Sequence, residues 1–213
     1  MKILAIGAHP DDIEIGCGAT LLKYSSLGHK IHLMVMTEGQ KGGHAEERHK
    51  EQRKSARILK PADVMWGRYH DTELPRNLNH MIVDIEKMLK KIEPDFILVN
   101  HGEDTHQDHR ELCKAAVSAT RYVKNVLFYE VPTTQNFTPS VFVDIKDTIE
   151  GKIAMLMAHK SQITKTHIEG LSIVEIAKST AVFRGIQGRV QFAEAFLPLR
   201  LFINVQTSGI ADL

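Results

Sequence analysis

Short apolar runs alternate along the chain with longer segments of helical periodicity. The runs that we expect to form buried strands are residues 3–7, 30–36, 64–66, 95–100, 126–131 and 142–145. The segments with helical spacing are residues 16–27, 45–59, 78–92, 110–121 and 148–160. The clearest is 78–92, where apolar side chains three and four positions apart form one face. Strands that are apolar almost throughout, each followed by a helix, are typical of a parallel sheet covered on both faces.

The predicted fold class is therefore α/β, a Rossmann-like, doubly wound, mostly parallel sheet with helices on both faces. Residues 165–192 are less regular, because glycines interrupt them and no element can be assigned. The apolar start of segment 197–213 indicates a late strand at the sheet edge or a contact with another copy. No repeat, low-complexity segment or linker divides the chain, so we expect a single domain over residues 1–213.

Charge and composition narrow the function classes. The 213 residues include 27 basic and 26 acidic side chains, for a net charge of +1, so nucleic acid is not an expected partner. No apolar window approaches the roughly 18–20 residues of a membrane span, and no signal-peptide pattern begins the chain. Cys17 and Cys113 are too few and too far apart for a disulfide framework. We therefore expect a cytoplasmic protein without a membrane span.

A cluster of chemically active side chains follows the first apolar run. His9, Asp11 and Asp12 stand where the predicted strand 3–7 emerges from the sheet. Open α/β sheets carry their chemistry just outside the carboxyl ends of the strands. An imidazole and a carboxylate suit a divalent metal, and a second carboxylate is available for proton transfer.

A second cluster follows the run 95–100. His106 and His109 are three residues apart, with Asp108 between them and a predicted helix after them, so both imidazoles can point the same way. A single histidine near a loop is more often solvated, and an aspartate at a helix start is often only an N-cap. Two such clusters at equivalent strand ends favour a metal site.

These two clusters carry a resemblance to a known family. The sequence Ala8-His9-Pro10-Asp11-Asp12 together with His106-x-Asp108-His109 resembles the LmbE-like, or PIG-L, family of zinc-dependent de-N-acetylases. Weaker similarity continues through residues 37–59, 152–162 and 184–196, so the resemblance covers residues 1–196. One departure is Gln107, where the family often has proline; no ligand is lost by it.

The resemblance implies a metal centre with an open coordination position. The implied ligands of Zn²⁺, or of another divalent transition metal, are His9, Asp12 and His109. A set of two histidines and one carboxylate leaves room for water, as in catalytic rather than structural zinc sites.

The resemblance also implies roles for three neighbouring residues. Asp11 would act as the general base towards a water molecule. His106, when protonated, would stabilise the oxyanion of the tetrahedral intermediate. Asp108 would hold an imidazole in the correct tautomer and orientation. Either Asp11 or His106 would protonate the product amine, and the sequence does not choose between them.

Three more residues are implied to bind substrate: Arg48, Glu51 and His159. Each also has a plainer interpretation. Arg48 and Glu51 are three positions apart on a Lys/Glu-rich helix and would ordinarily form a solvated face. His159 follows a helical stretch and could simply bond the last carbonyls of that helix. Both interpretations stay open at this point.

The resulting functional hypothesis is a zinc-dependent hydrolase that removes an acetyl group from an N-acetylated amino sugar or sugar conjugate of the N-acetylglucosamine type. The partner implied is thus a small-molecule amino-sugar conjugate. An alternative within the same superfamily is an amidase of a larger sugar or thiol conjugate. The resemblance also implies a homo-oligomer, a trimer or a hexamer.

Two non-catalytic alternatives fit the sequence less well. A Rossmann-like ligand-binding module would need a phosphate-cradling glycine loop after the first strand, where this chain has carboxylates that repel phosphate. A metal-binding relative without activity would need neither Asp11 nor His106.

Overall fold

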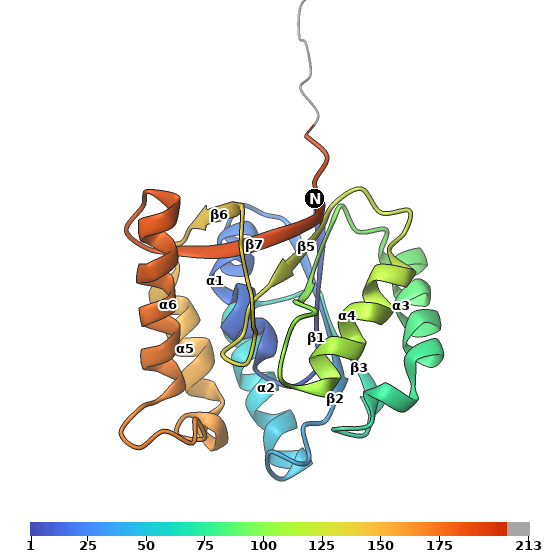
Figure 1. The fold of residues 1–213 in the computed structure, drawn as a ribbon, viewed down its shortest axis with the longest axis horizontal. Helices are drawn as coiled ribbons and strands as arrows, with labels where there is room; N and C mark the ends of the chain where they lie inside the picture. The colour runs from blue at the N-terminus through green and yellow to red at the C-terminus, as the bar shows by residue number, and fades with distance from the viewer. Residues whose placement is uncertain (204–213) are drawn as a thin grey trace, which may run out of the picture.

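Seven strands form one sheet in the order β3-β2-β1-β4-β5-β7-β6 (Figure 1). The computed structural model describes residues 1–203, so residues 204–213 of the predicted domain lie outside the described residues. The strands are β1 (Lys2–Gly7), β2 (Lys30–Thr37), β3 (Asp63–Tyr69), β4 (Phe96–Asn100), β5 (Val126–Tyr129), β6 (Val141–Asp144) and β7 (Ala193–Arg200). The first five are parallel, and β7 runs antiparallel to β5 and β6. The predicted Rossmann-like, mostly parallel fold is confirmed.

Helices cover both faces of the sheet (Figure 1). They are α1 (Asp12–Ser26), α2 (Ala45–Leu59), α3 (Leu78–Ile92), α4 (Gln107–Ala119), α5 (Ile149–Ala158) and α6 (Ile173–Gly188). Alternate residues of β1 point to different cores: Leu4 and Ile6 pack with α3 and α4, whereas Ile3 and Ala5 pack with α1. Because both faces are buried, the strands are apolar at nearly every position, which is the pattern that made them visible in the sequence.

Two helices begin earlier than their patterns predicted. Helix α1 starts at Asp12 rather than at residue 16, because the Asp12 carboxylate accepts a hydrogen bond of 2.9 Å from the backbone N–H of His9 and closes the turn. Helix α4 starts at Gln107 rather than at residue 110, with His106 as its N-cap. The early turn of α4 is polar, and residues 12–15 of α1 alternate acidic and apolar side chains, so neither turn shows helical apolar periodicity.

The C-terminal region corrects two further expectations. Residues 173–188 of the unassigned region form α6, which begins at a capping box between Ser172 and Glu175. Strand β7 lies inside the sheet rather than at its edge, because β6 pairs with its outer side.

A close contact with β5 fixes the start of α1 beside the site. A Cβ atom at Gly16 would overlap the Tyr129 ring, so only glycine lets this turn pack against Tyr129. The Tyr129 hydroxyl in turn donates to the carbonyl oxygen of Ile6 at 2.8 Å. These contacts fix the position of the first turn of α1 relative to the sheet.

None of the helices within residues 1–203 combines the length and the apolar character that crossing a membrane requires.

Candidate metal centre

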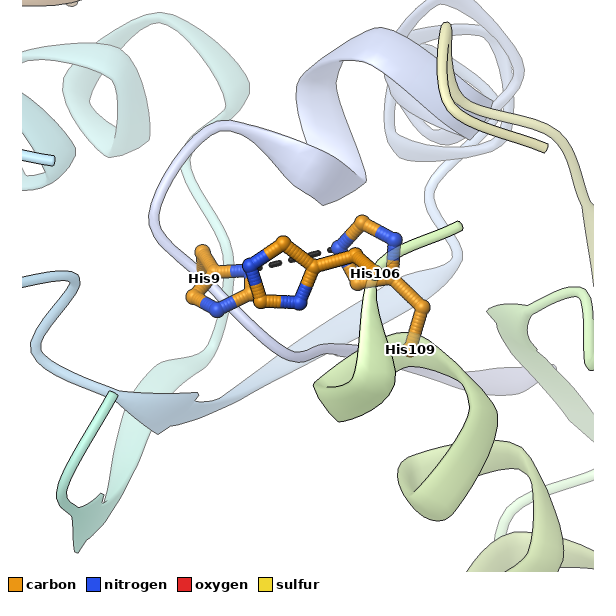
Figure 2. Close-up of side chains that lie close together, drawn as sticks. All are labelled: His9, His106 and His109. Carbon is orange, nitrogen blue, oxygen red and sulfur yellow. Dashed lines mark hydrogen bonds between the residues drawn. The ribbon is translucent and has the colours of Figure 1, made fainter. Parts of the chain in front are cut away.

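Two imidazoles and one carboxylate meet at the carboxyl ends of β1 and β4, which are neighbouring strands. His9 closely follows β1, Asp12 begins α1, and His109 lies in the first turn of α4. All three side chains are buried. Figure 2 shows the rings of His9 and His109 close together, with His106 beside them. The structure thus brings the three ligands implied by the sequence to one point.

The spacing of the three inward-facing atoms suits a tetrahedral metal. His9 Nδ1 lies 3.2 Å from His109 Nε2. The Asp12 Oδ2 atom lies 3.5 Å from His9 Nδ1 and 3.3 Å from His109 Nε2. Ligand atoms about 2.0–2.1 Å from a tetrahedral zinc ion are about 3.3 Å from one another. Two nitrogens and one oxygen at this spacing form three corners of such a site and leave the fourth corner for water or substrate.

The outer nitrogen of each imidazole faces a carboxylate. His9 Nε2 lies 3.1 Å from Asp71 Oδ1 and 3.3 Å from Asp108 Oδ2. His109 Nδ1 lies 3.1 Å from Asp104 Oδ2. Carboxylates in these positions keep the proton on the outer nitrogen, so each inner nitrogen presents a lone pair to a metal. Asp108 is thus placed where the sequence-based hypothesis put it, against an imidazole.

Asp71 and Asp104 were missed by the sequence reasoning. Asp71 follows β3 as His9 follows β1, and this position at a strand exit was the available signal. Asp104 lies in the loop between β4 and α4, where aspartate is an ordinary turn residue.

The electrostatics of the cluster favour a bound cation. Burial alone would lower the pKa of His9, but the neighbouring carboxylates, above all Asp108, raise it well above its usual value. Burial also opposes protonation of His109, but Asp12 and its other neighbours raise that pKa to about 9. Burial would raise the pKa of Asp12, yet His109 and His9 hold it well below its usual value. The carboxylates therefore stabilise positive charge within the cluster, and a divalent metal would supply this charge in place of protons.

Two other sets of three residues have ligand atoms close enough to surround an ion. They are His9, His106 and His109, and His9, Asp71 and Asp108. His106 Nδ1 instead accepts a hydrogen bond of 3.2 Å from the backbone N–H of Asp108. The Asp108 carboxylate accepts from the backbone N–H groups of Thr72 at 2.7 Å and Leu74 at 3.2 Å. Both oxygens of Asp108 are thus bonded to the backbone, whereas Asp12 accepts a backbone hydrogen bond on Oδ2 alone, so the set with Asp12 is better placed for a metal.

Asp11 lies beside the cluster in a strained backbone conformation. Its φ of 94° is in a region that costs a residue other than glycine about 1–3 kcal/mol. Arg48 holds the segment: one guanidinium nitrogen donates to the carbonyl oxygen of Pro10 at 2.6 Å and lies 3.3 Å from Asp11 Oδ1. Burial raises the pKa of Asp11 to about 6, although Arg48 opposes the rise. Asp11 is therefore an ionisable carboxylate suited to accepting a proton near neutral pH.

The glycine-rich segment after β2 makes room for that arginine. A Cβ atom at Gly39 would overlap Arg48 Nη1, and the φ of Gly39 is +63°. The same guanidinium nitrogen donates to the carbonyl oxygen of Gly39 at 3.0 Å. Glycine is thus required both for the backbone turn and for the approach of Arg48.

His106 reaches the cluster, where its surroundings oppose the protonated state that the resemblance implies. Burial and the nearby His9 and His109 lower its pKa. Its Nδ1 atom accepts the backbone hydrogen bond that caps α4, so the neutral ring carries its proton on Nε2. His106 can therefore donate one hydrogen bond from Nε2 without being charged.

Two cavities meet at this cluster and share four lining residues: Asp11, Asp12, His109 and Gln162. The smaller cavity, of about 300 Å³, has polar walls that include Lys41, Arg48, Asp71 and His106. We call it the polar cavity. The larger one, of about 650 Å³, runs along α6 and has mostly apolar walls. We call it the apolar cavity.

The three residues implied to bind substrate differ in their placement. Arg48 lines the polar cavity. Glu51 lines neither cavity, and both of its carboxylate oxygens accept hydrogen bonds of 2.7 Å from Ser161. His159 is 1% exposed, lines neither cavity and lies 3.6 Å from Glu14. The geometry gives Glu51 and His159 supporting positions behind the site rather than on its wall.

Comparison with known proteins agrees with this geometry. Residues 4–120, more than half of the chain, match the PIG-L family, described as GlcNAc-PI de-N-acetylase. The chain belongs to the PIG-L family. The uncharacterized deacetylase YaiS of Escherichia coli is 38% identical over an alignment of 167 residues that covers 75% of this chain and 90% of YaiS.

Two solved structures are similar over most of their length. The conserved protein TT1542 of Thermus thermophilus is 27% identical with a TM-score of 0.85, over 97% of this chain and 98% of that one. The N,N'-diacetylchitobiose deacetylase of Pyrococcus horikoshii is 28% identical with a TM-score of 0.81, over 93% of this chain and 83% of that one. The family match and the deacetylase relatives together show that this PIG-L chain is a hydrolytic N-deacetylase.

Proposed function

We propose that the protein is a zinc-dependent hydrolase that removes the acetyl group from an N-acetylated amino sugar of the N-acetylglucosamine type. The observation that carries this proposal is the convergence of His9, Asp12 and His109 to within 3.5 Å of one another beside Asp11. Two nitrogens and one carboxylate with an open corner are the donor set of a catalytic zinc site.

The sugar part of the proposal rests on the polar cavity and on the relatives. Arg48, Asp71 and Lys41 offer donors and acceptors for hydroxyl groups within reach of the metal ligands. The similar enzyme from Pyrococcus horikoshii acts on N,N'-diacetylchitobiose, as its name states. An amino sugar bearing an N-acetyl group fits both observations.

The proposed chemistry assigns one task to each side chain. A divalent metal held by His9, Asp12 and His109 would polarise the amide carbonyl and make a water molecule more acidic. Asp11 accepts the proton of the attacking water, since its carboxylate is next to the ligands and ionised at neutral pH.

The remaining steps fall to His106 and again to Asp11. His106 donates the hydrogen on Nε2 to the oxygen that gains negative charge when water adds to the carbonyl. Asp11 returns its proton to the nitrogen as the carbon–nitrogen bond breaks. The products are acetate and a free amine.

A screen for amine release tests this proposal. Protein reconstituted with zinc is incubated with N-acetylglucosamine, N,N'-diacetylchitobiose and an N-acetyl amino acid as the control amide. We expect turnover of one or both sugars, no turnover of the amino acid, and loss of turnover on chelation. Hydrolysis of another amide, with no turnover of any amino sugar, would replace the proposal by the amidase alternative.

A cytoplasmic location and a trimeric or hexameric assembly stay predictions.

A further inference from the structure

The apolar cavity is larger than an acetyl group needs. Its α6 wall includes Ile173, Ile176 and Ala177, and Val131 and Leu171 face it from two loops. Its volume of about 650 Å³ is within the roughly 300–1,000 Å³ of pockets that enclose whole small-molecule ligands. A single methyl group would leave most of this space unfilled.

Four charged side chains on the walls of the apolar cavity form two ion pairs. Lys152 Nζ lies 2.7 Å from Glu194 Oε1, and Arg184 Nε donates to Glu130 Oε1 at 2.6 Å. Lys165 also lines the cavity and donates to the carbonyl oxygen of Gly42. Apart from Lys165, His167 and the residues of the metal centre, the walls offer little unmatched charge to a polar ligand. The cavity is accordingly suited to a hydrocarbon chain.

The position of the two cavities matches the two sides of an amide. The carbonyl carbon of an amide carries the acyl chain on one side and the nitrogen with its sugar on the other. Both cavities reach Asp11, Asp12 and His109, and Gln162 stands between them, bonded to the carbonyl oxygen of Gly42 at 3.2 Å. With the sugar in the polar cavity, the acyl chain is directed into the apolar cavity.

We propose that the site hydrolyses amino sugars whose N-acyl chain is longer than acetyl, with a medium-length fatty acyl group such as octanoyl in the apolar cavity. This inference rests on the proposed hydrolysis of N-acyl amino sugars. The reaction stays the same: water adds to the carbonyl, the carbon–nitrogen bond breaks, and a fatty carboxylate and an amine leave.

Two substrates with the same apolar content separate the possible positions of a chain. N-octanoylglucosamine carries its chain on the acyl side, whereas octyl N-acetylglucosaminide carries it on the glycosidic side. Burying one methylene is worth about 0.8 kcal/mol, or about fourfold in kcat/KM. We expect the N-octanoyl compound to exceed N-acetylglucosamine by at least about tenfold in kcat/KM, and the octyl glycoside to show no such gain.

A cavity-filling variant tests the location. Ile176 lines the cavity, whereas Val182 of the same helix is 44% exposed and lines neither cavity. We expect Ile176→Trp to lower kcat/KM for the N-octanoyl compound at least about tenfold and to change that for N-acetylglucosamine less than about threefold. Val182→Trp should leave both values unchanged. Melting temperatures of both variants show that they are folded.

Binding of octanoate, the product of the longer substrate, gives a readout that does not need turnover. Calorimetry should show octanoate binding to the parent protein and to Val182→Trp, and at least about tenfold weaker binding to Ile176→Trp.

Three results would overturn the inference: a preference for the octyl glycoside, hydrolysis of acetyl compounds alone, or equal effects of the two tryptophan variants. If no amino sugar were hydrolysed, the proposed function would fail instead, and octanoate binding would still decide whether the cavity takes the chain.

Discussion

The parallel part of the sheet and its antiparallel extension contribute different things to the site. The side chains of the candidate metal centre, and the carboxylates that face them, lie in the segments that follow strands β1, β3 and β4. The extension, β6 and β7 with α5 and α6, adds no side chain to that centre within residues 1–203. It supplies most of one cavity wall instead. The reactive groups and most of the apolar cavity are thus built by different parts of the chain.

A buried ion pair joins the two parts. Lys152 Nζ donates to the carbonyl oxygen of Ile15 at 2.6 Å, and Glu194 accepts from the backbone N–H groups of Ala19 at 3.0 Å and Thr20 at 2.7 Å. In a regular helix the carbonyl of Ile15 and the N–H of Ala19 bond each other. The extension therefore bonds backbone groups of α1, whose first turn carries Asp12.

Loss of a ligand should produce the largest effect and leave the fold intact. We expect His109→Ala to abolish turnover and stoichiometric zinc after dialysis, because two ligand atoms cannot hold the ion. Metal analysis and the melting temperature of the metal-free protein check this. His80→Ala, at an exposed position on α3, should keep both metal and activity. A His109→Ala protein that retained tightly bound zinc would remove His109 from the ligand set.

Breaking the ion pair between Lys152 and Glu194 should lower the stability of the protein but leave zinc binding intact. Lys152 and Glu194 have side chains only 4% and 2% exposed, so Lys152→Met leaves a buried carboxylate unpaired, at a cost of about 3–5 kcal/mol in the free energy of unfolding. The folded protein should still bind zinc. Lys160→Met, at an exposed position, should change stability by less than about 0.5 kcal/mol. Equal stability of the two variants in urea titrations would contradict the account.

A change in the orienting carboxylates should have a smaller effect. Asp104→Asn keeps the size of the side chain but removes the charge facing His109 Nδ1. We expect zinc affinity to fall about 10- to 100-fold. Competition with a chromogenic chelator measures this, and unchanged affinity would show that Asp104 plays no part in the centre.

The pH dependence of metal binding should be gentler still. In the metal-free protein the pKa of His109 is raised to about 9, so this ring holds a proton at pH 7 that the metal must displace. Competition from that proton fades as pH rises towards 9, so affinity should increase by close to tenfold per pH unit between pH 7 and 8.5. An affinity independent of pH over this range would contradict the raised pKa.

The sequence predicted the parallel part well because its strands are buried on both faces. Such strands read as short apolar runs, and polar residues directly after them mark the sheet edge where chemistry gathers. The sequence pattern therefore predicts that His9 and His109 lie at one edge of the sheet, whereas the structure shows that β1 and β4 are neighbours. The helices at residues 45–59 and 78–92 match α2 and α3 to the residue.

In the antiparallel part, the sequence predicted β6 and α5 but not α6, because the signals of α6 conflict. Helix α6 has Ala177 and Ala181 buried, but it also exposes Val182, Phe183 and Ile186, so no single apolar stripe appears. Gly185 near its end looks like a helix breaker, yet a Cβ atom there would lie 2.6 Å from the carbonyl oxygen of Gln191. This close approach depends on tertiary contacts, which the local sequence does not reveal. The same holds for the apolar cavity that α6 lines.

The division between the two paired aspartates is the central claim, and one variant tests it most directly. Asp12 is placed to hold the metal and Asp11 to move the proton, so Asp11→Asn should bind one zinc per chain as the parent does. Its kcat on the best amino sugar should fall by at least about 100-fold, because general base catalysis contributes about 10²–10⁴. Zinc content and kcat measured on the same preparation decide the matter. Full activity, or loss of zinc together with activity, would contradict this division.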